Sequence, residues 1–437
     1  MAAKAERMRL INLDQLTVGM KLAQPLFGRR GRLLLAKGVA LTHRYMALLR
    51  HGGVPAIYVL DDDTSDIDSG DPIAPEARAK ALTNLSDAFD QVAKAGESLR
   101  QVPVELMRKH LEEDKFVKTL VADGAGDALC SLSKDVDTLV NGLQGHDVLT
   151  GLNSIKTHDQ YTFMHSLDVT IMGLALASAA GWEGTKLKTF GIGCLLHDLG
   201  KILIDPALLN KAGPLTPDEF EKLKAHPATG YEIIRAIAPR LGGLVPLVAH
   251  QHHERQDGSG YPRGIKGNEQ LGNSDPTRIH EFGAVCAIAD IYDAMISHRP
   301  YRRARPADEV VGTISKYSGT HLNAQAVKIF MTTVTPFPLC SPVKVKNGKY
   351  AGYEGIVSEV HKNDFQRPTV RLLYNAERAR VDAIEINLAV DRDIDIESVR
   401  DEKSQLDSLG SPSHNPQPKT RAYAVPKAVL AALKQAS

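Results

Sequence analysis

Residues 191–201, GIGCLLHDLGK, join a run of apolar residues to an adjacent histidine and aspartate. The apolar run predicts a buried helix, so His197 and Asp198 come at the buried end of that helix. A carboxylate without a partner is costly there, and a metal ion would relieve the cost. Neighbouring helix residues point about 100° apart, so the imidazole can bind one ion while the carboxylate bridges to a second. The same dipeptide alone is more often a capped or surface pair, so residues elsewhere in the chain decide between the two interpretations.

The histidines are concentrated in the middle of the chain, where ten of the sixteen lie between His146 and His298. Five predicted helices in this region offer imidazole or carboxylate groups beside hydrophobic residues. These groups belong to His165, His197, Asp198, His226, His252, His253 and Asp290. Neutral imidazoles and bridging carboxylates suit Fe, Mn or Zn, and two closely spaced ions can share one hydroxide nucleophile. The middle of the chain therefore predicts a metal-dependent site.

The composition excludes several classes of protein. With 53 Lys and Arg against 52 Asp and Glu in 437 residues, the net charge of +1 gives no field that would gather a nucleic-acid polymer. The four cysteines form no C-x-x-C pair, which argues against a disulfide framework or a zinc ribbon and fits a reducing cytoplasm. The amino-terminal residues lack the apolar stretch of a secretory signal. The longest nearly apolar run, 169–182, is shorter than the roughly 20 residues of a membrane span, so we expect a cytoplasmic protein.

Hydrophobic periodicity predicts a multidomain chain in five parts. They are a small α/β amino-terminal module with an acidic linker (1–74), a helical connector (75–148), an all-α domain (149–340), a small β-domain (341–400) and a flexible tail with a short helix (401–437). In the all-α domain the predicted helices cover 157–180, 186–199, 216–238, 243–253, 278–297 and 306–317. The β-domain has a hairpin signal at Asn347-Gly348. The connector helices form either a packing layer or the pairing surface of a homodimer.

The middle region resembles the HD-GYP family, a branch of the HD metal-dependent phosphohydrolase superfamily. The matching stretches are HDQYTFMHS (158–166), HDLGKILID (197–205), LLNKAGPLTPDEFEKLKAHP (208–227), HHERQDGSGYPRGIKG (252–267) and ADIYDAMISHRPYRRA (289–304). Together they span about 147–330 in the order and spacing of the family. The stretch LTVGMKLAQPLFGRRGRLLLAKG (16–38) also resembles the small module that precedes some members.

The resemblance implies an all-α HD-type catalytic domain with phosphodiesterase activity on cyclic di-GMP. The product would be the linear dinucleotide pGpG, with GMP left open as a further product. The metal ligands would be His165, His197, Asp198, His226, His252, His253 and Asp290. Asp198 would bridge two divalent ions, Fe or Mn before others, and a hydroxide shared by the ions would attack phosphorus.

The resemblance also implies groups that hold the substrate. Lys201 matches the phosphate-facing lysine of the family and is assigned to catalysis and substrate binding, while Arg299 and Arg302 match its phosphate-gripping cations. The alternative for each is a surface charge at a helix end or turn. Tyr261, in the loop DGSGYP, is assigned to substrate binding or docking rather than to catalysis. The family implies that this loop also contacts diguanylate cyclases of the GGDEF type.

Several residues qualify the resemblance. Glu254 and Asp293 are interpreted as groups that orient histidine ligands or cations, not as direct ligands. Some family members carry Glu four positions before the first histidine ligand and use it toward a third metal, but Tyr161 stands there, which favours two ions. His298 and Asn323 each stand where the family commonly has Asp. These two departures do not remove a predicted ligand.

Two alternative functions remain open. The first is a protein without catalytic activity that binds the cyclic dinucleotide or a cyclase and signals through the amino-terminal module. The second is a phosphohydrolase for another nucleotide, either a different cyclic dinucleotide or a guanosine polyphosphate. The complete ligand set favours an enzyme over the first alternative, and the HHE and GYP segments disfavour the more distant substrates.

Overall fold

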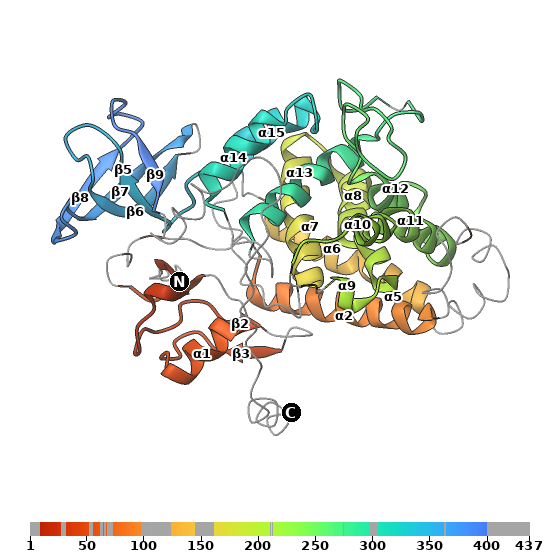
Figure 1. Cartoon of the computed structure of the whole chain (residues 1–437), viewed down its shortest axis with the longest axis horizontal. Coiled ribbons are helices and arrows are strands. Elements are labelled where there is room, and N and C mark those ends of the chain that lie inside the picture. The colour runs from red at the N-terminus through yellow and green to blue at the C-terminus, as the bar shows by residue number, and fades with distance from the viewer. Residues whose placement is uncertain are drawn as a thin grey trace.

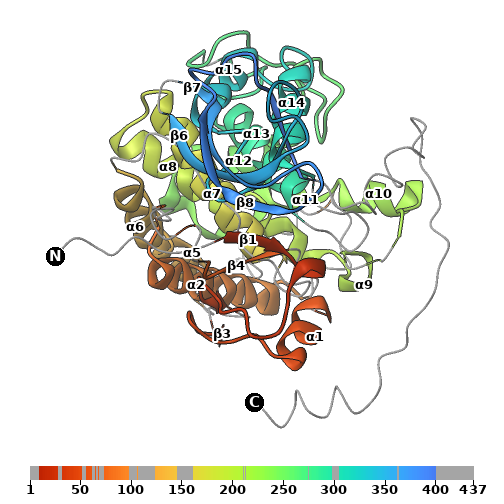
Figure 2. The ribbon, with the colours of Figure 1, turned by 90° about the vertical axis from the view of Figure 1, so that its left-hand side faces the viewer.

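The computed structural model describes residues 9–27, 32–51, 56–61, 64, 67, 73–97, 106, 124–144, 161–209, 211, 213–273, 275–297, 305–361 and 364–399. A large helical body carries the amino-terminal strands and the carboxy-terminal sheet on the same side (Figures 1 and 2). The predicted tail with its short helix lies outside the described residues, as does the beginning of the first predicted helix in the all-α domain.

The helical body contains the helices that carry the candidate ligands and further helices packed around them. They are α7 (Tyr161–Ala179), α8 (Gly184–Leu196), the 3-10 helix η6 (Leu199–Leu203), α9 (Pro206–Leu209), α10 (Pro217–Leu223), α11 (His226–Ile237), η7 (Pro239–Leu241), α12 (Leu244–Gln251), α13 (Glu281–Ile296), α14 (Ala307–Lys316) and α15 (Ala324–Thr333). α7 packs against α8 and α13, and α12 packs against α8, α11 and α13. This packing brings the ends of several helices to one place in the body.

The single helix predicted for 216–238 is wrong. α10 begins at a capping box, in which Thr216 Oγ1 accepts from the backbone N–H of Glu219 and the Glu219 carboxylate accepts from the backbone N–H of Thr216. It ends at Leu223, and α11 starts at His226 with Pro227 in its first turn, where the missing N–H has no helical partner to lose. The break places His226 at the beginning of a helix rather than in the middle of one.

The long apolar helix α7 is part of the protein core. Within the described residues, its window Thr162–Ala179 is long and apolar enough to cross a membrane by length and composition. However, 72% of that window is buried inside the protein. The composition of α7 is thus accounted for by its packing among α2, α8, α13 and α15.

The connector helices pack directly on the helical body. They are α2 (Pro75–Ala95), α5 (Ala125–Ser131) and α6 (Ser133–Leu143), and their apolar side chains belong to the same hydrophobic core as those of α7 and α8. Phe89 of α2 meets Phe163 of α7 edge to face, with ring centroids 5.6 Å apart. Arg78 Nη1 of α2 donates to Asp168 Oδ1 of α7 at 2.7 Å in a buried ion pair. Pairing of these helices with a second copy stays a prediction.

The predicted carboxy-terminal β-domain contains a five-stranded sheet. Its strands are β5 (Pro342–Val345), β6 (Glu354–His361), β7 (Asp364–Tyr374), β8 (Arg380–Asn387) and β9 (Ile396–Ser398), in the order β8-β7-β6-β5-β9 with every pair antiparallel. Its own apolar core includes Val343, Val357 and Val370. Gly348 takes a positive φ of 76° in the turn between β5 and β6.

The amino-terminal elements form small antiparallel pairs beside one helix. β1 (Arg9–Asn12) pairs with β4 (Ala56–Val59), β2 (Leu26–Phe27) pairs with β3 (Leu33–Leu35), and α1 (His43–His51) lies before β4 in the chain. Ile57 and Leu22 are fully buried in a cluster of their own. These elements thus have a hydrophobic core separate from that of the helical body.

Candidate metal centre

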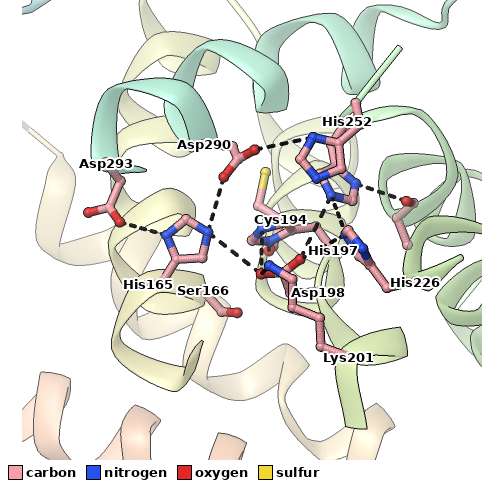
Figure 3. A network of polar contacts seen from close by, with 12 residues as sticks. His165, Ser166, Cys194, His197, Asp198, Lys201, His226, His252, Asp290 and Asp293 are labelled. Carbon is pink, nitrogen blue, oxygen red and sulfur yellow. Dashed lines mark hydrogen bonds and ion pairs between the residues drawn. The ribbon is translucent and has the colours of Figure 1, made fainter. Parts of the chain in front are cut away.

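All seven predicted ligands lie at the centre of the helical body. His165 comes from α7, His197 and Asp198 from the end of α8, His226 from the start of α11, His252 and His253 from the end of α12, and Asp290 from α13. The ligand atoms of six of them form two groups, each within 4.8 Å: one of His226, His252 and His253, the other of His165, His197 and Asp198. Figure 3 shows the side chains converging from these separate helices.

Asp198 lies between the two groups with one oxygen toward each. Its Oδ1 is 3.3 Å from His226 Nε2 and 3.8 Å from His252 Nε2. Its Oδ2 is 3.5 Å from His197 Nε2 and 3.6 Å from His165 Nε2. A carboxylate in this position can bind one ion through each oxygen.

Asp290 also reaches both groups. Its Oδ1 is 3.1 Å from His165 Nε2, and its Oδ2 is 3.8 Å from His253 Nδ1. Both carboxylates of the site are therefore placed between imidazoles of different groups. The sequence pattern had placed only Asp198 in such a position.

Hydrogen bonds to backbone carbonyls set the orientation of three histidines. The Nδ1–H of His197 donates to the carbonyl of Cys194 at 2.7 Å, and that of His226 donates to the carbonyl of Leu223 at 2.7 Å. The Nδ1–H of His252 donates to the carbonyl of Ala249 at 2.8 Å. A neutral imidazole with its proton on Nδ1 has a lone pair on Nε2, so each ring presents a ligand atom to the centre.

Two of these lone pairs face each other. His226 Nε2 lies 3.3 Å from His252 Nε2, although both rings have committed Nδ1–H to a carbonyl. Two neutral acceptors at this distance repel unless a cation or a shared proton lies near both. The buried Nε2 of His197 likewise has no hydrogen-bond partner among the described residues. These nitrogens fit a divalent ion, which takes neutral imidazole as a ligand.

For most of these groups, the electrostatic environment favours the protonation state that binds a metal ion. Burial lowers the pKa of His197, lowers that of His252 well below its usual range, and lowers the pKa of His253 to about 3. Burial opposes ionisation of Asp198 and Asp290, but Lys201 acting on Asp198 and His165 acting on Asp290 hold both pKa values well below the usual range. The site therefore presents anionic carboxylates beside neutral imidazoles.

His165 differs from the other histidines. Burial acts to lower its pKa, but contacts with Asp290 and Asp293 outweigh burial and raise it. Its Nδ1 lies 2.6 Å from Asp293 Oδ2, which agrees with the interpretation of Asp293 as a group that orients a ligand. The two carboxylates stabilise a second proton on the His165 ring. A divalent ion bound at Nε2 would replace that proton.

Lys201 and Tyr261 both lie at the site. Lys201, in η6, places Nζ 2.5 Å from Asp198 Oδ2. The ring of Tyr261 lies 4.8 Å from that of His253 at an interplanar angle of 32°. Burial, followed by the charges of Asp290 and Asp198, raises the pKa of Tyr261, so its phenol stays neutral. Arg299 and Arg302 lie outside the described residues.

Glu254 differs from its interpretation as a group that orients ligands. Its carboxylate accepts from the backbone N–H of Arg263 at 2.7 Å and from that of Ile265 at 3.1 Å. The side chain thus holds the far end of the loop that contains Tyr261. The loop is also tight at Gly260, where a Cβ would lie 2.4 Å from the backbone nitrogen of Arg255.

Glu254→Ala is expected to free the loop that contains Tyr261 while the metal content stays unchanged. It removes two charge-assisted hydrogen bonds, each worth about 1.5–3 kcal/mol, so Tyr261 moves relative to His253. Limited proteolysis of the loop together with metal quantification checks this. Glu269→Ala removes an exposed carboxylate and should leave both measurements unchanged. A fall in bound metal for Glu254→Ala would contradict the loop-holding role.

Gly200 also positions the site, although no pattern in the sequence was assigned to it. A Cβ on Gly200 would lie 2.0 Å from the carbonyl oxygen of His226, so η6 touches the first turn of α11 backbone to backbone. A glycine two residues after Asp198, within a helical pattern, is the signal that could have found it. Asn323, one of the departures from the family pattern, caps α15 through its Oδ1, which accepts from the backbone N–H of Ala326 at 2.9 Å.

A match to a known protein family points to the same part of the chain. Residues 153–326 match the family described as the HD domain. A cyclic di-GMP phosphodiesterase of Pseudomonas aeruginosa is 33% identical over 234 residues, which cover 54% of this chain and 53% of that protein. A cyclic di-GMP phosphodiesterase of Thermotoga maritima is 35% identical over 186 residues, 42% of this chain and 48% of that protein.

A third relative carries a different specificity in its name. A 3'3'-cGAMP-specific phosphodiesterase of Vibrio cholerae is 25% identical over 269 residues, which cover 59% of this chain and 56% of that protein. The chain spans about half the length of the curated relatives that it matches.

Proposed function

We propose that this chain, whose residues 153–326 match the HD domain family, is a metal-dependent phosphodiesterase that hydrolyses cyclic di-GMP. The proposal is carried by the Nε2 lone pairs of His226 and His252, which face each other. Beside them, the carboxylate of Asp198 reaches both groups of imidazoles. This arrangement suits two cations better than any purely structural role. The relatives named cyclic di-GMP phosphodiesterases support the choice of substrate.

We assign the first ion to His226, His252 and His253 and the second to His165 and His197, with Asp198 and Asp290 reaching both. Iron or manganese fits imidazole and carboxylate donors in these proportions. Two divalent ions held there would supply Lewis-acid charge toward the scissile phosphate and activate a water molecule.

The protein groups around the ions have separate tasks. Lys201 places its ammonium at Asp198 Oδ2, where it keeps the carboxylate ionised and adds positive charge near a bound phosphate. Asp293 accepts from His165 Nδ1–H and thereby keeps Nε2 directed at the centre. Tyr261 covers His253 and limits the edge of the site. Arg299 and Arg302 remain our candidates for gripping the phosphate.

Metal and product analysis tests the proposal. Protein purified without oxygen should contain about two ions of iron or manganese per chain and convert cyclic di-GMP to pGpG, with GMP as a slower product. Removal of the ions with a chelator should abolish turnover, and return of Mn²⁺ or Fe²⁺ should restore it. Binding of cyclic di-GMP without turnover across these metals would contradict the proposal and favour a receptor.

A second substrate candidate is 3'3'-cGAMP, because a Vibrio cholerae relative is specific for it. Turnover of both cyclic dinucleotides, measured side by side, separates the two. We further propose that the loop from Asp257 to Pro262 is a contact site for GGDEF-type cyclases, that the amino-terminal α/β module is the regulatory part of the chain, and that the protein acts in the cytoplasm.

A further inference from the structure

A line of aromatic rings leads from the metal centre to the surface. The ring of Tyr261 lies 4.8 Å from that of His253, and the ring of Phe220 lies 6.4 Å from that of Tyr261, edge to face. Phe220 belongs to α10, a short helix with no buried residues. The line therefore ends on an aromatic side chain at the edge of the site.

Phe220 is exposed to an extent that packing does not explain. The residue is 42% exposed and is one of a few large apolar residues of the described chain that are exposed. The helix is instead held by polar contacts, through the capping box at Thr216 and an ion pair between Lys211 Nζ and Glu219 Oε2 at 2.5 Å. These contacts fix the position of α10, so the ring of Phe220 faces solvent in a fixed position.

A cation lies over the same rings. Lys224 Nζ is 4.9 Å from the centroid of Phe220 and 5.8 Å from that of Tyr261. Its ion pair with Glu221, at 2.7 Å, is on the surface and contributes little, so the ammonium can turn toward another acceptor. Lys224 is also close in sequence to the metal centre, because it is two residues before His226.

We propose that Phe220 and Lys224, together with Tyr261, form the subsite that binds one guanine base of the cyclic dinucleotide. This inference rests on the proposed function. A base carried on the sugar beside the scissile phosphate would stack on the exposed ring of Phe220. The ammonium of Lys224 would donate to O6 and N7 of guanine, whereas adenine presents an amino donor at the position of O6. Phe220 thus supplies affinity and Lys224 supplies discrimination between guanine and adenine.

The first test is Phe220→Ala in the full chain. We expect KM for cyclic di-GMP to rise roughly tenfold with kcat within about twofold, because stacking on an aromatic ring holds the substrate and does not touch the reacting atoms. Phe220→Trp keeps a stacking face and should restore KM. Lys222→Ala removes an exposed cation from the same helix and should leave KM unchanged.

A binding measurement on metal-free protein gives a readout independent of turnover. A cyclic di-GMP analogue with 2-aminopurine in place of one guanine should lose fluorescence on binding, since a stacked fluorophore is quenched, and Phe220→Ala should remove this loss. Lys224→Met should lower the ratio of affinities for cyclic di-GMP and cyclic di-AMP roughly tenfold.

The outcomes separate this inference from the proposed function. If the unaltered, metal-loaded protein leaves cyclic di-GMP intact, the proposed function fails. Alternatively, the unaltered protein is active while Phe220→Ala shows the same KM and the same loss of fluorescence on binding. In that case the assignment of the base-binding subsite is wrong. A fall in kcat at constant KM for Phe220→Ala also overturns the subsite, because it indicates a structural role for α10.

Discussion

Asp198→Asn is expected to lower kcat for cyclic di-GMP by more than about a hundredfold, beyond the roughly 10–100-fold cost of losing a group that only positions a ligand. Both carboxylate oxygens lie within 3.8 Å of histidine Nε2 atoms, Oδ1 toward one group and Oδ2 toward the other. The amide has the same shape but no charge and only one acceptor, so it cannot bind an ion through each atom. Product analysis by chromatography and metal quantification on the same sample check the result.

Asp382→Asn is the matched control. Asp382 is exposed on β8, an edge strand of the carboxy-terminal sheet, so the same chemical change there should alter neither turnover nor metal content. Thermal unfolding shows whether Asp198→Asn is folded. A folded Asp198→Asn protein that keeps its metal and its activity would remove Asp198 from the reaction.

Gly200→Ala is expected to lower kcat by about a hundredfold without changing any group of the metal centre. The added methyl would lie 2.0 Å from the carbonyl oxygen of His226 and 2.7 Å from the backbone nitrogen of Gly230, which a real structure cannot allow. η6 and α11 must therefore separate, and Asp198, two residues before Gly200, shifts relative to His226. A displacement of about 1 Å in a catalytic arrangement can cost roughly 10²-fold in rate.

Two other glycines provide the comparison for this effect. A Cβ on Gly230 would lie 3.1 Å from the nitrogen of Gly200, so Gly230→Ala should show the same loss to a smaller degree. Gly312, on α14, has no atom within 4 Å of the Cβ position, and Gly312→Ala should keep full activity and gain about 0.5–1 kcal/mol of stability. Denaturant unfolding and kinetics of the three variants give the series. Equal activity of Gly200→Ala and Gly312→Ala would show that the contact between η6 and α11 does not position the site.

Much of the helical body could be predicted from local sequence. The apolar run before His197 predicted a buried helix with the His-Asp pair at its end, and α8 ends at Leu196, directly before that pair. The alternation around Asn347-Gly348 predicted the strands that form the carboxy-terminal sheet. Periodicity and turn residues act over a few neighbours, so they can be read without knowledge of the fold.

Other features depend on contacts that local sequence does not reveal. Glu254 looks like a group beside two histidines but binds backbone N–H groups nine and eleven residues later. The exposure of Phe220 beside Tyr261 likewise follows from the placement of a loop against a helix.

The kinds of side chain at the metal centre were thus available from the residues alone, since imidazole and carboxylate are chosen by the chemistry of a divalent ion. Their arrangement was not. Which oxygen of Asp198 faces which histidines, and which imidazole nitrogen keeps its proton, follow from helix ends that meet across the core and from carbonyls of the preceding turn. Packing between distant segments sets those positions. Local sequence determines each helix, but not how that helix is oriented against the helices beyond the next loop.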